Sequence, residues 1–129
     1  MTILIIDDDP EDTSLFREAL YELFPNAVCI IAHNCEKIRS AMEKIGEVDM
    51  IFLDRHMYPI EGKECLEQLT KIVDHSKTKI VIYSGSISPM EQLALEKAGA
   101  DYTLIKASNY YLLKSSVGEM LANCVDHNP

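Results

Sequence analysis

Carboxylates follow two apolar segments of the chain, at the point where each segment ends. Asp7 and Asp8 come directly after residues 3–6, and Asp54 follows residues 50–53. A short, uncharged run of large side chains is typical of a buried strand. In an open α/β sheet, ligands bind outside the carboxyl ends of the strands. The three carboxylates therefore stand where chemistry is expected, although any one of them alone is explained equally well as a cap or a turn residue.

A hydroxyl and an ammonium group occupy the same kind of position. Ser84 and then Gly85 follow the apolar segment 79–83, and Lys106 follows the segment 102–105. A serine hydroxyl can donate a hydrogen bond to a phosphoryl oxygen, and a lysine can neutralise its charge. The glycine leaves space for such a group to enter. Singly, these residues are typical of turns and solvated surfaces; together, at strand ends, they indicate a site.

The chemistry of this set is that of a divalent cation and a phosphoryl group. Three carboxylates held close together repel one another and raise one another's pKa. A bound cation relieves that repulsion, and an all-oxygen set without a Cys or His cluster is typical of Mg²⁺. A carboxylate beside Mg²⁺ is also a plausible nucleophile towards phosphorus. We therefore predict a Mg²⁺ site formed by Asp7, Asp8 and Asp54.

Strand-like segments alternate with segments of helical periodicity along the chain. We expect strands at residues 3–6, 28–32, 50–53, 79–83 and 102–105, and helices at about 10–24, 35–45, 62–73, 89–98 and 109–124. Two N-caps are predicted: Asp9, which precedes Pro10, and Asn34. A capping box is predicted for Ser88 with Glu91. Five β-α repeats predict an α/β fold, in which a parallel sheet carries helices on both faces.

Right-handed crossovers favour one topology for this pattern, a flavodoxin-like doubly wound sheet of five strands in the order 2-1-3-4-5. In that order, the strands that precede Asp7, Asp54, Ser84 and Lys106 are consecutive neighbours. Adjacent strands lie about 4.8 Å apart. The topology therefore predicts that the carboxylates, the hydroxyl and the ammonium surround one small crevice.

Composition excludes several classes of function. The 129 residues are enough for one domain, expected over 1–129, and they carry a formal net charge of -9. Such a charge opposes binding to nucleic acid and to anionic lipid, so neither is an expected partner. No run of 18 apolar residues and no basic leader segment is present, so we expect a cytoplasmic protein without a membrane span.

The four cysteines are expected to be reduced and buried. They are Cys29, Cys35, Cys65 and Cys124. No two of them form a C-x-x-C motif, and none has zinc-ligand spacing to a histidine. In a reducing cytoplasm, such cysteines behave as small hydrophobic residues.

With these motifs in place, nearly the whole chain resembles the receiver domain of two-component response regulators. Asp7 and Asp8 match the acidic pair after the first strand, and Asp54 matches the phosphoacceptor. Met57 and Gly62, three and eight residues after Asp54, match the family's D-x-x-M-P-x-x-x-G pattern. The set of spacings continues at later positions: Ser84 lies 30 residues after Asp54, and Lys106 lies 22 residues after Ser84.

The resemblance implies a function for each of these positions. Asp8 would contact Mg²⁺, the His56 backbone carbonyl would add a metal ligand, and Ser84 would be the switch residue, with Lys106 as the active-site lysine. It implies a stand-alone receiver that accepts a phosphoryl group on Asp54 from a histidine kinase. Such a protein phosphorylates and dephosphorylates itself but is not an enzyme for an external metabolite. Its signal would pass through the helix 4–strand 5–helix 5 surface to an unidentified downstream protein.

Some positions depart from the family pattern. Tyr58 replaces the usual proline, and Pro59 follows one place late. Ala107 follows the lysine where the family commonly has proline, and Thr103 occupies the position of an aromatic switch residue. Because side chains alternate across a strand, Tyr102 faces away from Thr103 and does not replace the missing ring. We therefore expect the signal to travel through the loop after Ser84 instead.

Four alternatives remain beside the receiver interpretation. A phosphorelay intermediate would pass the group on to a histidine phosphotransfer protein. A small Mg²⁺-dependent aspartyl phosphatase needs a second Asp two residues after the nucleophile, where this chain has His56. A flavodoxin-like electron carrier needs a phosphate loop where residues 7–9 are acidic. A scaffold that no longer accepts phosphate would not need the intact set of residues.

Overall fold

A computed structural model of the chain describes residues 1–57, 60–107 and 109–126. Five parallel strands form one sheet in the order β2-β1-β3-β4-β5, which confirms the predicted topology. The strands are β1 (Thr2–Ile6), β2 (Val28–Ala32), β3 (Met50–Asp54), β4 (Lys79–Ser84) and β5 (Tyr102–Ile105), and the helices are α1 (Pro10–Leu23), α2 (Ile38–Ile45), α3 (Gly62–Leu69), α4 (Pro89–Ala98) and α5 (Tyr110–Asp126).

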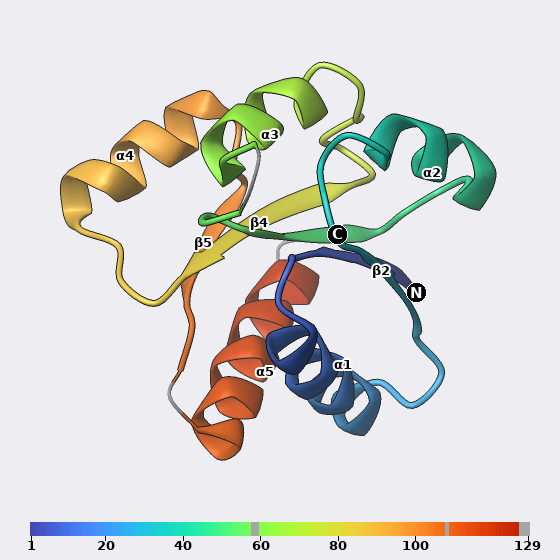
Figure 1. The fold of residues 1–129 in the computed structure, drawn as a ribbon. Helices are drawn as coiled ribbons and strands as arrows, with labels where there is room; N and C mark the ends of the chain where they lie inside the picture. Colours follow the sequence, from blue (N-terminus) through green and yellow to red (C-terminus); the bar gives the residue numbers. More distant parts are fainter. Residues whose placement is uncertain (58–59, 108, 127–129) are drawn as a thin grey trace.

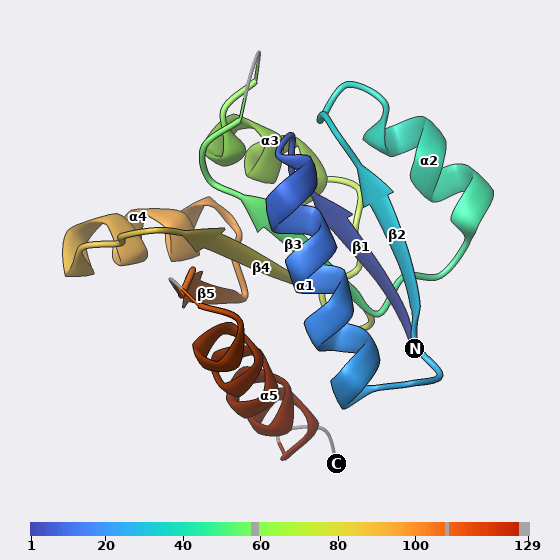
Figure 2. The ribbon, with the colours of Figure 1, turned by 60° about the horizontal axis from the view of Figure 1, so that its bottom comes forward.

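Helices cover both faces of the sheet. Figure 1 shows α1 and α5 on one face and α2, α3 and α4 on the other, and α1 and α5 also lie side by side in Figure 2. Each face has its own apolar core because successive side chains of a strand point to opposite faces. Phe16 and Val117 pack in the core beneath α1 and α5, while Leu66 and Leu95 pack in the core beneath α3 and α4.

The three central strands are apolar along nearly their whole length because both of their faces are covered. Every residue of β3 is buried, and so are four of the five residues of β1. β5, at an edge of the sheet, exposes Ile105. Burial therefore fixes the register of the three central strands, whose carboxyl ends carry Asp7, Asp54 and Ser84.

Two helix starts follow the capping chemistry expected from the sequence. The Asp9 side chain accepts a hydrogen bond from the Glu11 N–H at the start of α1. At the start of α4, Ser88 and Glu91 form the reciprocal capping box. None of the described helices is both long enough and apolar enough to cross a membrane.

Two helix boundaries were predicted wrongly. The Asn34 side chain accepts from the Lys37 N–H at 3.4 Å, so it caps a turn, and α2 begins only at Ile38. Helix α3 ends at Leu69, four residues earlier than expected. After it the chain turns, and the Thr70 hydroxyl lies 2.7 Å from His75 Nε2.

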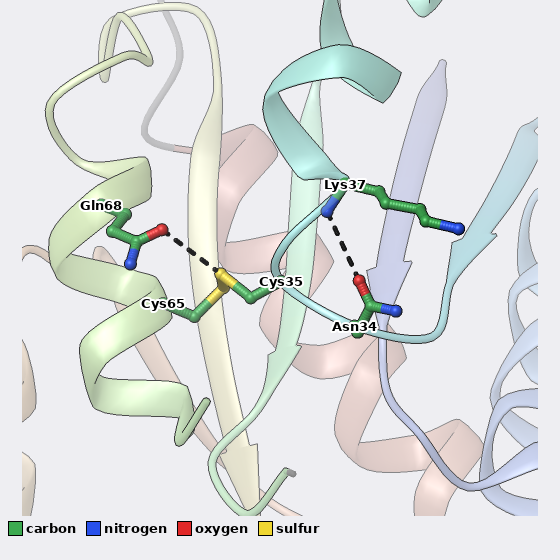
Figure 3. Close-up of a disulfide and its surroundings, with 5 residues drawn as sticks. All are labelled: Asn34, Cys35, Lys37, Cys65 and Gln68. Atoms are coloured by element: carbon green, nitrogen blue, oxygen red, sulfur yellow. Dashed lines mark hydrogen bonds between the residues drawn. A yellow bond between two sulfur atoms is a disulfide. The ribbon is translucent and has the colours of Figure 1, made fainter. Parts of the chain in front are cut away.

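The expectation that all the cysteines are reduced was also wrong. Cys35, in the loop between β2 and α2, forms a disulfide with Cys65 on α3, with a Cα–Cα distance of 5.8 Å (Figure 3). Cys29 is a buried free thiol, and the side chain of Cys124 lies outside the described residues. The paired cysteines are 30 positions apart in the sequence and β3 lies between them, so the fold, not a local motif, brings their sulfur atoms together.

The disulfide should stabilise the fold under oxidising conditions. In the chain-entropy model, a cross-link that closes a loop of this length lowers the conformational entropy of the unfolded chain. This loss raises the free energy of unfolding by about 3–4 kcal/mol. We expect a reductant to lower the free energy of unfolding of the parent in urea titrations, and to leave a Cys35→Ser/Cys65→Ser variant unaffected. Alkylation of both cysteines in the unreduced, unfolded protein would show that the bond is absent.

Candidate functional site

The acidic residues predicted from the sequence meet at the carboxyl ends of β1 and β3. Asp7 and Asp8 follow β1, and Asp54 is the last residue of β3. One carboxylate oxygen from each residue lies within 4.8 Å of the others. Asp7 and Asp54 are buried, at 0% and 6% exposure, whereas Asp8 is exposed and gives the cluster an open side.

This crowding changes the ionisation of Asp54. Burial, followed by the charge of Asp7, raises the pKa of Asp54 to about 7. The His56 N–H, which donates to Asp54 Oδ1 at 3.1 Å, opposes the shift, as does the positive charge of Lys106. In the absence of a cation, the Asp54 carboxylate is therefore only partly ionised near neutral pH.

Lys106 lies beside the carboxylates, at the carboxyl end of β5. Its Nζ is 4.0 Å from Asp54 Oδ2 and 3.6 Å from Asp7 Oδ2, but it makes its shortest contact, 2.7 Å, with Asp12 Oδ2 on α1. Burial alone would lower the pKa of Lys106, but hydrogen bonding to Asp12 and the surrounding carboxylates raise it overall. Asp12 lies in the first turn of α1, and no spacing in the sequence links it to the lysine.

Ser84 ends β4 and brings an unused hydroxyl to the same edge. The residue is 2% exposed, and its Oγ has no hydrogen-bond partner among the described residues. A buried polar atom without a partner is costly unless a ligand or water satisfies it. Gly85 next to it is exposed, and a Cβ atom placed there would meet no atom within 4 Å.

Backbone hydrogen bonds hold the two ends of the loop after Asp54. The Arg55 N–H donates to the Tyr83 carbonyl, and the Gly62 N–H donates to the Arg55 carbonyl, both at 2.9 Å. A Cβ atom on Gly62 would collide with the Asp54 carbonyl oxygen, which explains the glycine at this position.

His56 has an exposed side chain, and its ring nitrogen lies 3.7 Å from a Glu61 carboxylate oxygen. The role of its backbone carbonyl as a metal ligand stays a prediction. The departure at Tyr58 and Pro59 lies outside the described residues.

A tyrosine that the sequence did not single out completes the site. The Tyr83 hydroxyl donates to Asp7 Oδ2 at 2.6 Å, and the side chain is fully buried. Burial and the charge of Asp7 raise the pKa of Tyr83, which keeps the phenol protonated and able to donate. An apolar strand pattern does not distinguish this tyrosine from an ordinary core residue.

The arrangement fits a divalent cation with an anionic group bound next to it. Three clustered carboxylates supply only oxygen ligands, the set that Mg²⁺ prefers. The unpartnered Ser84 hydroxyl and the Lys106 ammonium can each donate to an anion near Asp54. The site therefore has an acidic part for a metal and a donor part for a phosphoryl group.

The raised pKa of Asp54 gives a signed prediction for metal-free protein. The folded state holds this proton up to about pH 7, whereas the unfolded chain releases it near the ordinary value of 3.8. The associated stability is therefore present at low pH and is lost as the pH rises through about 7.

In urea titrations at about pH 5 and about pH 8, the parent should lose more unfolding free energy on going to high pH than Asp54→Asn does. Equal losses in the two proteins would show that Asp54 does not titrate in this way.

Comparisons with known proteins agree with this geometry. The response regulator receiver domain model matches residues 3–117. Stress response regulator protein 1 of Clavispora lusitaniae is 22% identical over 126 residues, which are 95% of this chain and 66% of that protein.

Two solved structures share the fold. Chemotaxis protein CheY4 of Vibrio cholerae has a TM-score of 0.80 at 18% identity, with 95% of this chain and 96% of that one covered. The Mn²⁺-bound form of response regulator Rcp1 has a TM-score of 0.79 at 19% identity, with 98% and 95% covered. From the match over residues 3–117, the chain belongs to the response regulator receiver domain family.

Proposed function

We propose that this chain accepts a phosphoryl group on Asp54 from a histidine kinase, with Mg²⁺ held by Asp7, Asp8 and Asp54, and that it signals to another protein in that state. The observation that carries the proposal is the position of Asp54. It is a buried carboxylate within 4.8 Å of two other acids, with Lys106 Nζ at 4.0 Å and the unpartnered Ser84 hydroxyl on the neighbouring strand.

In the transfer, an oxygen of Asp54 forms a bond to phosphorus, and the bond between phosphorus and the kinase imidazole nitrogen breaks. The electron pair of the broken bond stays on the imidazole, which leaves neutral or takes a proton from solvent. Bound Mg²⁺ would supply positive charge to the transferring oxygens and favour the ionised form of Asp54. Lys106 and Ser84 donate to the phosphoryl oxygens, which restrains the group and replaces contacts with water.

Metal binding is supported by this chain's own donor set and by the metal found in a relative. The oxygen-only cluster of Asp7, Asp8 and Asp54 has an exposed member through which a cation can enter. Rcp1, which shares the fold, has a Mn²⁺-bound form. Mn²⁺ and Mg²⁺ both favour carboxylate and water ligands.

Signal output is proposed to use the surface formed by α4, β5 and α5. Large apolar side chains are exposed on these elements: Met90, Leu93, Ile105, Tyr111 and Leu112. Where such side chains form a contiguous patch, they mark a surface that binds a protein partner. Arg55, directly after the phosphoacceptor, pairs with Glu91 in the first turn of α4 and so connects the site to this surface.

The same acceptor chemistry would serve a phosphorelay intermediate, which differs only in passing the group to a histidine phosphotransfer protein. In either case the chain acts on its own Asp54 and is not an enzyme for an external substrate. We place it in the cytoplasm, where the ATP that charges histidine kinases is found. The two functions differ in the downstream protein: a signalling receiver binds its partner, whereas a phosphorelay intermediate transfers the phosphoryl group to it.

With Mg²⁺ and a small phosphodonor, we expect one labile phosphoryl group on the parent and none on Asp54→Asn. Asp49→Asn is a matched control, because Asp49 is an exposed acid directly before β3, at the opposite end of the strand. It should be labelled like the parent. Intact-mass spectrometry measures the result, and labelling of Asp54→Asn equal to that of the parent would refute the acceptor assignment.

The path of the signal gives a second prediction. Tyr102 packs against the core beneath α1 and α5, as the alternation of β5 predicted, so its ring does not face the α4 side of the sheet. On adding beryllofluoride, a phosphoryl mimic, hydrogen exchange should change mainly in residues 84–90. Tyr102→Ala should keep that change. If this variant folds and binds the mimic but loses the change, Tyr102 gates the response after all.

A further inference from the structure

Tyr83 contacts Asp7, an acid of the site, from within the apolar core. Its hydroxyl lies 2.6 Å from Asp7 Oδ2, although Asp7 follows β1 and Tyr83 lies on β4, with β3 between the two strands. The ring has little freedom to move, because it is fully buried and stacks on Phe16 with a centroid distance of 5.2 Å. A buried, packed ring therefore presents its hydroxyl to Asp7 from a fixed position.

The carboxylate of Asp7 is oriented by donors on both of its oxygens. Oδ2 accepts from Tyr83, and Oδ1 accepts from the Asp9 N–H at 2.9 Å. Asp7 has no exposed surface, so solvent does not orient it. Removing the tyrosine hydroxyl would take the 2.6 Å donor from one oxygen of this buried carboxylate and leave Lys106 Nζ 3.6 Å from the same oxygen.

The ring of Tyr83 also contacts the positive part of the site. Lys106 Nζ lies 4.8 Å from the ring centroid, within the range of a cation–π interaction. The Tyr83 side chain thus contacts both Asp7, in the carboxylate cluster, and the Lys106 ammonium group, which lies near Asp54. A core residue selected only for packing would need neither contact.

We propose that Tyr83 is a positioning residue for the metal site, which holds the Asp7 carboxylate in the orientation that the cation requires. This inference rests on the proposed function, because it assumes that the cluster of Asp7, Asp8 and Asp54 binds Mg²⁺. Tyr83 does not touch the metal in this role. Partners that orient a metal-binding carboxylate typically contribute about 10–100-fold in metal affinity.

Tyr83→Phe tests the hydroxyl alone, because it keeps the ring, the stacking on Phe16 and the contact with Lys106. We expect its dissociation constant for Mg²⁺, measured by calorimetric titration, to be about tenfold higher than that of the parent or more. Val81→Ala is the matched control. Val81 lies two residues earlier on β4, is fully buried in the same core, and is paired in the sheet with Phe52 and Tyr102. It should lower stability and leave the Mg²⁺ affinity unchanged.

A double-mutant cycle separates an orienting role from a loss of stability. If Tyr83 acts through Asp7, then Asp7→Asn and Asp7→Asn/Tyr83→Phe should bind Mg²⁺ with equal affinity. Affinity of Tyr83→Phe equal to that of the parent, or an equal tenfold loss in both backgrounds, would overturn the inference. Failure of the parent itself to bind Mg²⁺ would instead contradict the proposed metal site, so the two failures are distinguishable.

Discussion

The mutual repulsion of buried carboxylates is the constraint on which the rest of the site depends. Two acids with almost no exposed surface meet at the ends of neighbouring strands, and a third stands at the opening. The fold tolerates this because positive charge and donors surround the acids: Lys106 Nζ, the Tyr83 hydroxyl and two backbone N–H groups. These groups do not supply one positive charge for each carboxylate. The remaining negative charge favours the binding of a cation.

The sheet was predictable because burial dictates its sequence. Central strands covered on both faces need continuous apolar runs, and the order of alternating strands and helices then leaves few topologies. Strands β2 and β5 match the expected bounds, and the other three differ by one residue at an end. Helix ends were less predictable. A single side-chain oxygen such as that of Asn34 can cap a turn as readily as a helix, so the start of α2 depends on packing.

The structure brings together the acids, Ser84 and Lys106 that the sequence placed at strand ends, because parallel strands present their carboxyl ends at one edge. Three features escaped prediction: the Cys35–Cys65 bond, the contact of Asp12 with Lys106, and the contact of Tyr83 with Asp7. Each joins residues that are distant in sequence and belong to different parts of the fold. Without a local pattern, such pairs become visible only when the elements are packed.

The contact between Asp12 and Lys106 has a consequence for the energetics of any incoming anion. The lysine already has a carboxylate at 2.7 Å, so pairing with a new anion near Asp54 is an exchange between two ion pairs. The free energy released is the difference between the two pairings and not the whole value of one. A change in the length or charge of residue 12 would therefore alter how readily the lysine pairs with that anion. Under the proposed function, residue 12, on α1 and away from the strand that carries Asp54, would therefore set how strongly the lysine pairs with a phosphoryl group, without any change at Asp54 itself.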